Sequence, residues 1–207
     1  MKFNRKTIIS IFLMFLFGGS IFLTAADILL RPRQQETEVE IVVMETSLGT
    51  MEIELNRDKA PITVENFVNY VEDEYYDGLC FHRIIKGFMI QGGGLDSSGE
   101  YKETKDPIVI ELQNGLKNVR GAIAMARSSD PNSATSQFFI NTVNNDNLDY
   151  PSFDGYGYTV FGLVISGMEV VDAIEAVATD TRDTLYGSMS DWPIDDIILI
   201  RAYMKTE

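Results

Sequence analysis

The sequence has 207 residues, of which 45% are hydrophobic and 23% are charged, so it is long and apolar enough for one ordinary domain with an accessory segment. Its 31 acidic residues outnumber its 17 basic residues and give a net charge of −14, which argues against nucleic acid as a partner because no basic surface is available. A single cysteine and a single histidine exclude an intramolecular disulfide and a metal site built from several histidines.

Residues 1–30 have the pattern of an export signal or a membrane anchor. Three basic residues within the first six positions precede an uncharged run over residues 7–26, and positive charge on the cytoplasmic side is typical of both kinds of segment. Small residues permit cleavage after Ala26, whereas the apolar residues 28–30 extend the run to a length that spans a membrane. Both outcomes remain open. A buried core helix is disfavoured because nothing polar marks a solvent face.

The rest of the chain is expected to lie outside the cytoplasm. Residues 31–38 are polar and suit a short tether, which leaves residues 39–207 as the folded domain. If the first segment is retained, residues 7–30 hold the protein in the inner membrane; if it is cleaved, the domain is released. The length of the apolar run favours the anchor.

The folded part begins with a pattern typical of a β-hairpin. Residues 39–46 are rich in β-branched side chains, and residues 51–55 alternate strictly between apolar and acidic side chains after a turn at 47–49. Pro61 then suits the first turn of a helix, and apolar side chains recur after it at i, i+3, i+4 and i+7. This stripe consists of Val64, Phe67, Val68 and Val71.

Most of the remaining chain has the pattern of short strands. The further predicted strands are Phe81–Ile84, Ile108–Glu111, Ala122–Met125, Phe138–Asn141, Thr159–Val164 and Ile197–Tyr203. A second helix is predicted from Met168 to Val177 because its apolar residues lie on one side. Many short strands with two helices predict a mainly β protein, either a closed barrel or a sandwich, and the pattern alone does not choose between them.

Three segments combine groups that suit binding or catalysis. Residues 81–94 read Phe-His-Arg-Ile-Ile-Lys-Gly-Phe-Met-Ile-Gln-Gly-Gly-Gly, which places a cation, large apolar side chains and an amide before a run of glycines. Glycines let the backbone turn or let a ligand approach closely. Residues 124–127 read Ala-Met-Ala-Arg and precede Ser-Gln-Phe-Phe-Ile-Asn at 136–141. The third segment is Tyr-Thr-Val-Phe-Gly at 158–162.

In their order and spacing, these segments resemble the cyclophilin family of peptidyl-prolyl cis/trans isomerases. The resemblance extends from Val39 to Met204, and the form of residues 124–127 and 133–139 is similar to that of the bacterial periplasmic branch. It implies an eight-stranded antiparallel closed β-barrel capped by two α-helices, here preceded by the N-terminal hydrophobic helix. It also implies that the partners are proline-containing unfolded or exported polypeptides, that the location is the periplasm, and that no cofactor or metal is needed.

The same resemblance assigns roles to particular residues. Arg83 matches the catalytic arginine, and Gln91 matches the glutamine that helps to orient the arginine and the substrate. A fixed donor suits this reaction because the prolyl nitrogen regains a lone pair when the amide is twisted. The proline ring is expected to bind Phe88, Met89, Phe139 and Leu148. The groove for the residues before proline is expected to contain Ala126, Arg127 and Gln137, with Tyr158 at the pocket rim.

Other functions were weighed against isomerisation. A membrane-tethered scaffold or holdase that binds proline-containing peptides without catalysis would need the pocket but not the guanidinium of Arg83. A hydrolase is disfavoured because a serine-histidine-acid set would have to use the single histidine, His82. Nothing in the sequence indicates an obligate dimer, so we expect a monomer.

Several residues near these segments are interpreted as structural. Cys80 and His82 are expected to be buried, since their neighbours have the pattern of a strand. Asp146, Asp149 and Asp154 are expected in a solvated loop, because their spacing lacks the glycine and the terminal glutamate of a known calcium loop.

Two features depart from the family pattern. Asn147 lies where members often carry tryptophan, and the resemblance implies that this weakens the binding of the inhibitor cyclosporin without removing isomerase activity. The segment around residues 181–191 differs from the best-known members, and it leads to no prediction.

Overall fold

The structure is a computed structural model, and it describes residues 39–206. The predicted export signal or anchor over residues 1–30 and the predicted tether over residues 31–38 lie outside the described residues. Within the part that is described, no helix is both long enough and apolar enough to cross a membrane.

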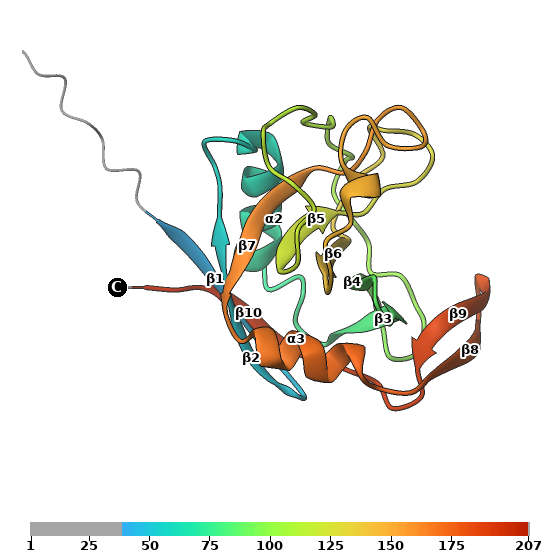
Figure 1. The fold of residues 1–207 in the computed structure, drawn as a ribbon. Coiled ribbons are helices and arrows are strands. Elements are labelled where there is room, and N and C mark those ends of the chain that lie inside the picture. Colours follow the sequence, from blue (N-terminus) through green and yellow to red (C-terminus); the bar gives the residue numbers. More distant parts are fainter. Residues whose placement is uncertain (1–38, 207) are drawn as a thin grey trace, which may run out of the picture. The chain divides into compact units, whose positions relative to one another are not determined.

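Within residues 39–206, the strands form one eight-stranded antiparallel sheet and a separate hairpin (Figure 1). The strands of the large sheet are β1 (Glu40–Thr46), β2 (Gly49–Leu55), β3 (Leu79–Ile85), β4 (Met89–Asp96), β5 (Ala122–Met125), β6 (Phe138–Asn141), β7 (Val160–Ser166) and β10 (Leu199–Met204). They lie in the order β10-β1-β2-β7-β5-β6-β4-β3. The hairpin consists of β8 (Thr179–Thr184) and β9 (Gly187–Pro193).

The two edges of the large sheet approach each other and nearly close it into a barrel. The backbone amide of Gly78 donates to the carbonyl of Leu199, and that of Phe81 donates to Ile197, both at 2.9 Å. β3 therefore pairs at its start with the segment that leads into β10. Closure of this kind leaves few unpaired edge groups. The prediction of a mainly β, eight-stranded antiparallel barrel with two helices is confirmed for the described residues.

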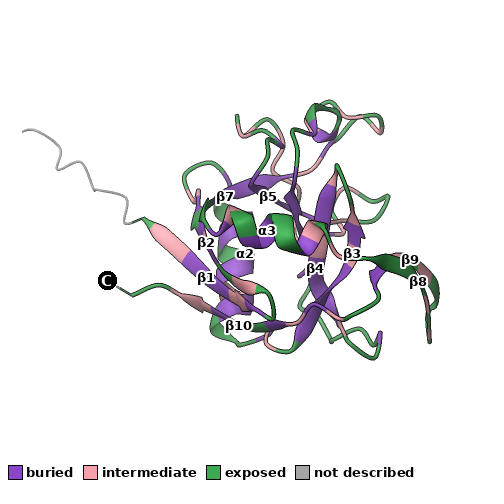
Figure 2. Ribbon diagram, turned by 60° about the horizontal axis from the view of Figure 1, so that its bottom comes forward, coloured by how far each residue is buried: buried purple, intermediate pink, exposed green. Residues whose placement is uncertain are grey.

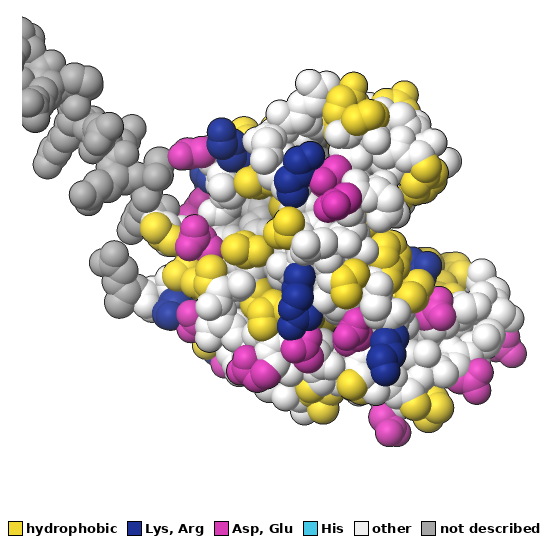
Figure 3. Space-filling view, in the orientation of Figure 1, with side chains coloured by type: hydrophobic (Ala, Val, Ile, Leu, Met, Phe, Trp, Pro, Cys, Tyr) yellow, Lys and Arg dark blue, Asp and Glu magenta, His cyan; other side chains and the backbone are white. Residues whose placement is uncertain are grey.

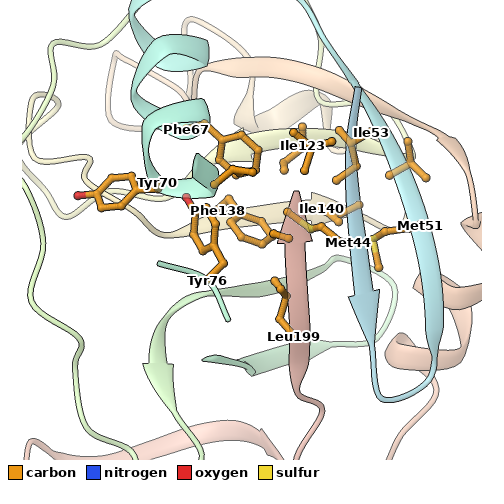
Figure 4. Packing of buried hydrophobic residues seen from close by; sticks show 14 of the residues in the cluster. Met44, Met51, Ile53, Phe67, Tyr70, Tyr76, Ile123, Phe138, Ile140 and Leu199 are labelled. Atoms are coloured by element: carbon orange, nitrogen blue, oxygen red, sulfur yellow. The ribbon is translucent and has the colours of Figure 1, made fainter. Parts of the chain in front are cut away.

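Alternating side chains of the strands fill the barrel interior. On β2, Met51, Ile53 and Leu55 are buried, and the residues between them face outward. Figure 4 shows Met51 and Ile53 in the same core as the aromatic rings of Phe67 and Phe138. There the rings of Phe67 and Phe138 meet edge to face, with their centroids 5.8 Å apart.

Two helices add their apolar faces to the same core. α2 (Pro61–Glu72) begins at the predicted proline, and its predicted stripe is buried. α3 (Met168–Glu175) ends two residues before the predicted Val177. It begins after Gly167, whose φ of +85° is left-handed and whose missing side chain leaves room for the carbonyl oxygen of Thr50; a Cβ would lie 2.5 Å from that oxygen.

One predicted strand is wrong. In the segment Ile108–Glu111, only Ile108 forms an isolated bridge, and no ladder follows. The segment instead satisfies the start of α2: the Glu111 carboxylate accepts hydrogen bonds from the backbone amides of Ile62, at 3.1 Å, and Thr63, at 2.8 Å. These amides belong to the first turn of the helix, where no helical carbonyl is available to them.

The sequence did not predict β4, because its glycines at 92–94 weaken the pattern of a strand. The structure shows why small residues occur there. A Cβ on Gly92 would lie 3.1 Å from the carbonyl oxygen of Cys80 on β3, and a Cβ on Gly94 would lie 2.5 Å from Cγ of Gln137. The glycines therefore allow close approach of a neighbouring strand and of a pocket side chain.

The β8–β9 hairpin was also not predicted. Most of it is exposed (Figure 2), but its base is anchored by Trp192, which is 1% exposed and packs with Cys80 and Leu95. Arg182 stacks over the indole ring, with its Cζ 4.7 Å from the ring centroid, and donates a 2.7 Å hydrogen bond to Asp196. The base of the hairpin is thus fixed against β3 and β4.

Cys80 and His82 are buried beside Trp192, as expected for structural residues. Burial raises the pKa of the Cys80 thiol to about 12, so the reactive thiolate is suppressed at neutral pH. Burial lowers the pKa of His82 to about 4, so the imidazole is neutral at neutral pH. Within residues 39–206, Nδ1 of His82 has no hydrogen-bond partner.

The lowered pKa of His82 predicts a pH-dependent contribution to stability. Since the unfolded histidine titrates near pH 6.5, the unfolded state binds more protons than the folded state between about pH 4 and pH 6.5. This contribution is fully present above pH 6.5 and is lost as the pH falls toward 4, at a cost of about 3 kcal/mol. In His82→Gln, the free energy of unfolding, measured in urea between pH 4 and pH 8, should lack this part of its dependence on pH. Equal pH slopes in both proteins would contradict a buried neutral imidazole.

Candidate active site

A pocket of about 420 Å³ lies beside β3, β4 and β6. It is lined by Arg83, Phe88, Met89, Gln91, Ala126, Arg127, Phe139, Asn147, Leu148, Phe153 and Tyr158. The structure therefore brings together all the predicted site residues except Gln137, which is hydrogen-bonded to the lining residue Gln91. The short 3-10 helix η1 (Asp146–Leu148) and the loop that follows it complete one wall.

The floor of the pocket belongs to an apolar cluster that is separate from the barrel interior. All four residues of β6 are buried, but Phe138 and Ile140 join the main core whereas Phe139 joins the second cluster with Met89 and Leu148. Because neighbouring side chains of a strand face opposite ways, the pocket is built on the outer side of the barrel wall. The ring of Tyr158 meets Phe139 edge to face, with a centroid separation of 5.5 Å.

Strand register aligns three of the predicted residues in one row. Arg83 on β3 is the partner of Gln91 on β4, and Gln91 is the partner of Phe139 on β6. Residues that are paired across adjacent strands point to the same face of the sheet. The guanidinium, the amide and the aromatic ring therefore stand side by side on the pocket face.

A bulge at His82 turns Arg83 toward this row. One residue, His82, lies between Phe81 and Arg83 on β3, but their partners Gly92 and Gln91 on β4 are consecutive. His82 is the extra residue, so Phe81 can face the core while Arg83 faces the pocket. Without the bulge, Phe81 and Arg83 would face the same side of the strand.

The Arg83 side chain is 43% exposed and has one ionic neighbour, Asp191 on β9, whose Oδ2 lies 3.8 Å from Nε. Asp191 has a left-handed φ of +63° and directly precedes the buried Trp192 that anchors the hairpin. Within the described chain, no protein acceptor forms a hydrogen bond with the terminal nitrogens of Arg83. Arg83 is also one of the residues that line the pocket.

Gln137 contacts the pocket lining through a hydrogen bond with Gln91. Its Oε1 accepts a 2.9 Å hydrogen bond from Nε2 of Gln91, which fixes the orientation of both amides. Gln91 in turn lines the pocket beside Arg83. The predicted contact of Gln137 with substrate stays a prediction, and the structure adds a positioning contact that the sequence did not reveal.

Arg127 lies in the pocket wall with its side chain only 3% exposed. Its guanidinium stacks over Tyr158, with Cζ 4.5 Å from the ring centroid, and donates to the carbonyl oxygens of Gly157 and Ser128 and to the carboxylate of Asp154. The hydrogen bond from Arg127 lowers the pKa of the Asp154 carboxyl to about 2. The donors of Arg127 are thus used within the protein, whereas its predicted contact with substrate is untested.

The loop over residues 149–158 is tied down by its acidic residues. Asp149 accepts hydrogen bonds from the backbone amide of Asn118, at 2.8 Å, and from its side-chain amide, at 3.0 Å. Asp154 accepts from the backbone amides of Tyr156 and Gly157 in addition to Arg127. The acidic character of this loop is therefore explained by contacts that set its conformation.

The structure places two residues at the site that the sequence had not assigned to it. Phe153 lines the pocket, and Asp191 approaches Arg83. Asn147, which the resemblance puts at an inhibitor-contacting position, also lines the pocket. No local pattern could have identified Asp191, because it depends on a hairpin that packs against β3 from far along the chain. Phe153 carried a signal in principle, as a large apolar residue between polar neighbours in a loop.

Comparison with known proteins identifies the family. The model of the cyclophilin type peptidyl-prolyl cis-trans isomerase/CLD family matches residues 41–204, which include β1 through β10 almost entirely. Peptidyl-prolyl cis-trans isomerase B of Escherichia coli is 48% identical over 161 residues, which are 77% of this chain and 96% of that protein. A peptidyl-prolyl cis-trans isomerase of Acinetobacter baylyi is also 48% identical, over 80% of this chain and 86% of that protein.

A solved structure agrees with these relatives. The cyclophilin type peptidyl-prolyl cis-trans isomerase of Cryptosporidium parvum, crystallised in the presence of the dipeptide Ala-Pro, superimposes with a TM-score of 0.69 at 31% identity and covers 81% of this chain and 99% of that one. Sequence, fold and pocket thus lead to one conclusion. The chain belongs to the cyclophilin-type peptidyl-prolyl cis-trans isomerases.

Proposed function

We propose that this protein accelerates the rotation of X-Pro peptide bonds in exported polypeptides, with Arg83 stabilising the twisted amide. The observation that carries this proposal is the row of Arg83, Gln91 and Phe139 across three paired strands, beside an apolar pocket. The row presents polar donors, a cation and an amide, next to a hydrophobic surface. Polar donors suit the amide of an X-Pro bond, and a hydrophobic surface suits its proline ring.

The reaction needs no covalent chemistry from the enzyme. The cis and trans forms of an X-Pro bond differ by about 1 kcal/mol, but amide resonance opposes rotation with a barrier of about 20 kcal/mol. At the twisted transition state the prolyl nitrogen is pyramidal and has a lone pair. A donor that meets this lone pair binds the transition state more strongly than the planar ground state, and only such a difference accelerates the reaction.

Arg83 has the properties that this donor needs. Guanidinium keeps its charge throughout the physiological pH range, and its planar shape fixes the direction of its N–H bonds. Asp191 approaches Nε, and Arg83 lines the pocket, so the terminal nitrogens are the donors that we expect to meet the substrate amide. The hydrogen bond between Gln91 and Gln137 holds the neighbouring amide in place. The guanidinium therefore needs little reorganisation when the substrate amide twists.

The apolar floor suits a proline ring. Met89, Phe139 and Leu148 are each at most 5% exposed, so the floor is already packed before a substrate arrives. A five-membered ring that settles on it removes apolar surface from water at about 25 cal/mol per Å². The floor can hold the proline ring still while the residue before proline turns. The rotation then takes place about the amide bond that joins the two residues.

The competing function is a scaffold or holdase that binds proline-containing peptides without catalysis. Such a protein would need the apolar floor, but it would gain nothing from a guanidinium donor in the pocket lining. The relatives named above support catalysis, since they are isomerases by name. Comparison of wild type with variants of Arg83 separates the two functions.

Arg83→Ala should lower kcat/KM for a short X-Pro peptide by about a hundredfold or more, or ~3 kcal/mol, because a donor used only at the transition state is lost. Arg83→Lys should recover only part of the rate, since ammonium lacks the planar fork. A protease-coupled or NMR exchange assay measures both. The wild-type rate should be flat between about pH 6 and pH 9, because the buried His82 is already neutral over this range.

Arg201→Ala is a suitable control, because Arg201 is exposed on β10 and lies outside the pocket lining. Its rate should match that of the wild type. Equal rates for wild type and Arg83→Ala would favour the scaffold instead. A rate that follows a group near pH 6.5 would contradict the role of Arg83, and it would not fit His82 either, because burial lowers the pKa of this single histidine to about 4.

We place this activity in the cell envelope. The support is the sequence of residues 1–30, with its basic start and its apolar run. In this proposal residues 7–30 remain as an anchor in the inner membrane, and a monomeric domain works on proline-containing polypeptides at the periplasmic surface.

Intact mass of the protein purified from the membrane fraction tests the anchor. Retention predicts the full chain of 23.3 kDa, extractable only with detergent. Recovery in the soluble periplasmic fraction of a chain that starts after Ala26 would show a cleaved signal instead. Recovery of the full chain from the cytosol would contradict export altogether.

A further inference from the structure

Phe153 is unusual among the residues of the pocket. It lines the pocket, yet its side chain is 82% exposed. Among the apolar side chains that line this pocket, it alone falls in the exposed class. In Figure 3 hydrophobic side chains lie at the surface of the upper part of the molecule, where the loop over residues 149–158 runs. An exposed aromatic ring beside a binding pocket is surface that a ligand can remove from water.

The ring is held in this exposed position by both of its neighbours. On one side, the Ser152 hydroxyl donates a 2.8 Å hydrogen bond to the carbonyl oxygen of Asn147 in η1. On the other side, Asp154 is bound by the buried Arg127 and by two backbone amides. The loop is therefore ordered before a ligand binds, which lowers the entropic cost of a contact with Phe153.

The proline ring itself already has its contacts elsewhere, on the buried floor of Met89, Phe139 and Leu148. The neighbouring groups on the exposed side of the lining, Arg83, Gln91 and Asn147, are polar. Phe153 thus supplies an apolar surface beyond the floor, where a residue adjacent to the bound proline would lie.

We infer that Phe153 is a specificity-determining residue, which selects X-Pro segments that carry an apolar side chain directly next to the proline. This inference rests on the proposed function, because it takes the proline ring as the occupant of the floor. The substrate class is therefore an unfolded polypeptide in which a hydrophobic residue flanks proline, a kind of sequence that a folded client would bury.

The experiment compares short peptides in which the residue before or after proline is alanine, leucine, phenylalanine or glutamate. Wild type should prefer leucine or phenylalanine to alanine by about fivefold in kcat/KM at one of the two positions, or ~1 kcal/mol, and the preference should appear in KM. In Phe153→Ser this ratio should fall to about one. Phe153→Leu should restore part of it, because the apolar surface returns in smaller form.

Leu185→Ser provides the matched control, because Leu185 is 80% exposed on the β8–β9 hairpin and does not line the pocket. Its peptide preference should equal that of wild type. A ratio that persists in Phe153→Ser, or a uniform loss for all peptides, would overturn the role of Phe153.

Dissociation constants of the same peptides, measured by calorimetry in parallel, separate this inference from the proposed function. If wild type binds peptides with the apolar preference but does not accelerate isomerisation, the proposed function fails and the role of Phe153 stands. If wild type accelerates isomerisation but neither KM nor the dissociation constants depend on the flanking residue, only the role of Phe153 fails.

Discussion

The register between β3, β4 and β6 is the constraint on which the site depends. It pairs Arg83 with Gln91 and Gln91 with Phe139, so three side chains from distant parts of the chain face the same way. A slip by one residue would send each of them to the opposite face. The bulge at His82 is part of this constraint, because it lets Phe81 fill the core while Arg83 points outward. The burial of a neutral imidazole and the aim of the guanidinium therefore have one structural cause.

The strands of the barrel wall contribute to both stability and binding, because their inner face packs in the core and their outer face lines the pocket. Ile123 and Met125 on β5 belong to the main core, whereas Ala122 and Ala124, which alternate with them, belong to the pocket cluster. The small alanines leave room on the outer face, where the large Phe139 provides the floor. Because the core is filled from the other side, a ligand on the floor does not have to disturb the packing of the barrel interior.

Much of the fold could be predicted because local patterns decided it. The burial stripe of α2 follows from helical periodicity, and β5 and β6 were short apolar runs with the predicted bounds. β4 was not predicted because glycine has a low strand propensity. The glycines of β4 are needed because neighbouring chain segments leave no room for a side chain. The segment after Ile108 looked like a strand, but the carboxylate of Glu111 is used to cap α2 from a distance. Patterns of single residues contain no information on such remote partners.

Some residues of the candidate site could likewise be predicted from the sequence, and others could not. Arg83, Gln91 and the apolar floor were recognisable because they lie in motifs whose residues are close in sequence. Asp191 and Phe153 were not, since each reaches the pocket through an element whose position is fixed by distant contacts. Trp192 fixes the hairpin that presents Asp191, and Arg127 fixes the loop that presents Phe153.

These two anchors differ in their physical nature. Trp192 is anchored by burial of its ring, whereas Arg127 is a buried cation that needs acceptors around its whole guanidinium. Removal of Asp154 would leave that cation without its carboxylate and would loosen the residues beside Phe153. The loop is thus ordered by folding rather than by ligand binding, and the exposed ring is available in a fixed place when a polypeptide arrives. An enzyme that must grip one ring while the neighbouring amide turns benefits from walls that do not move with the substrate.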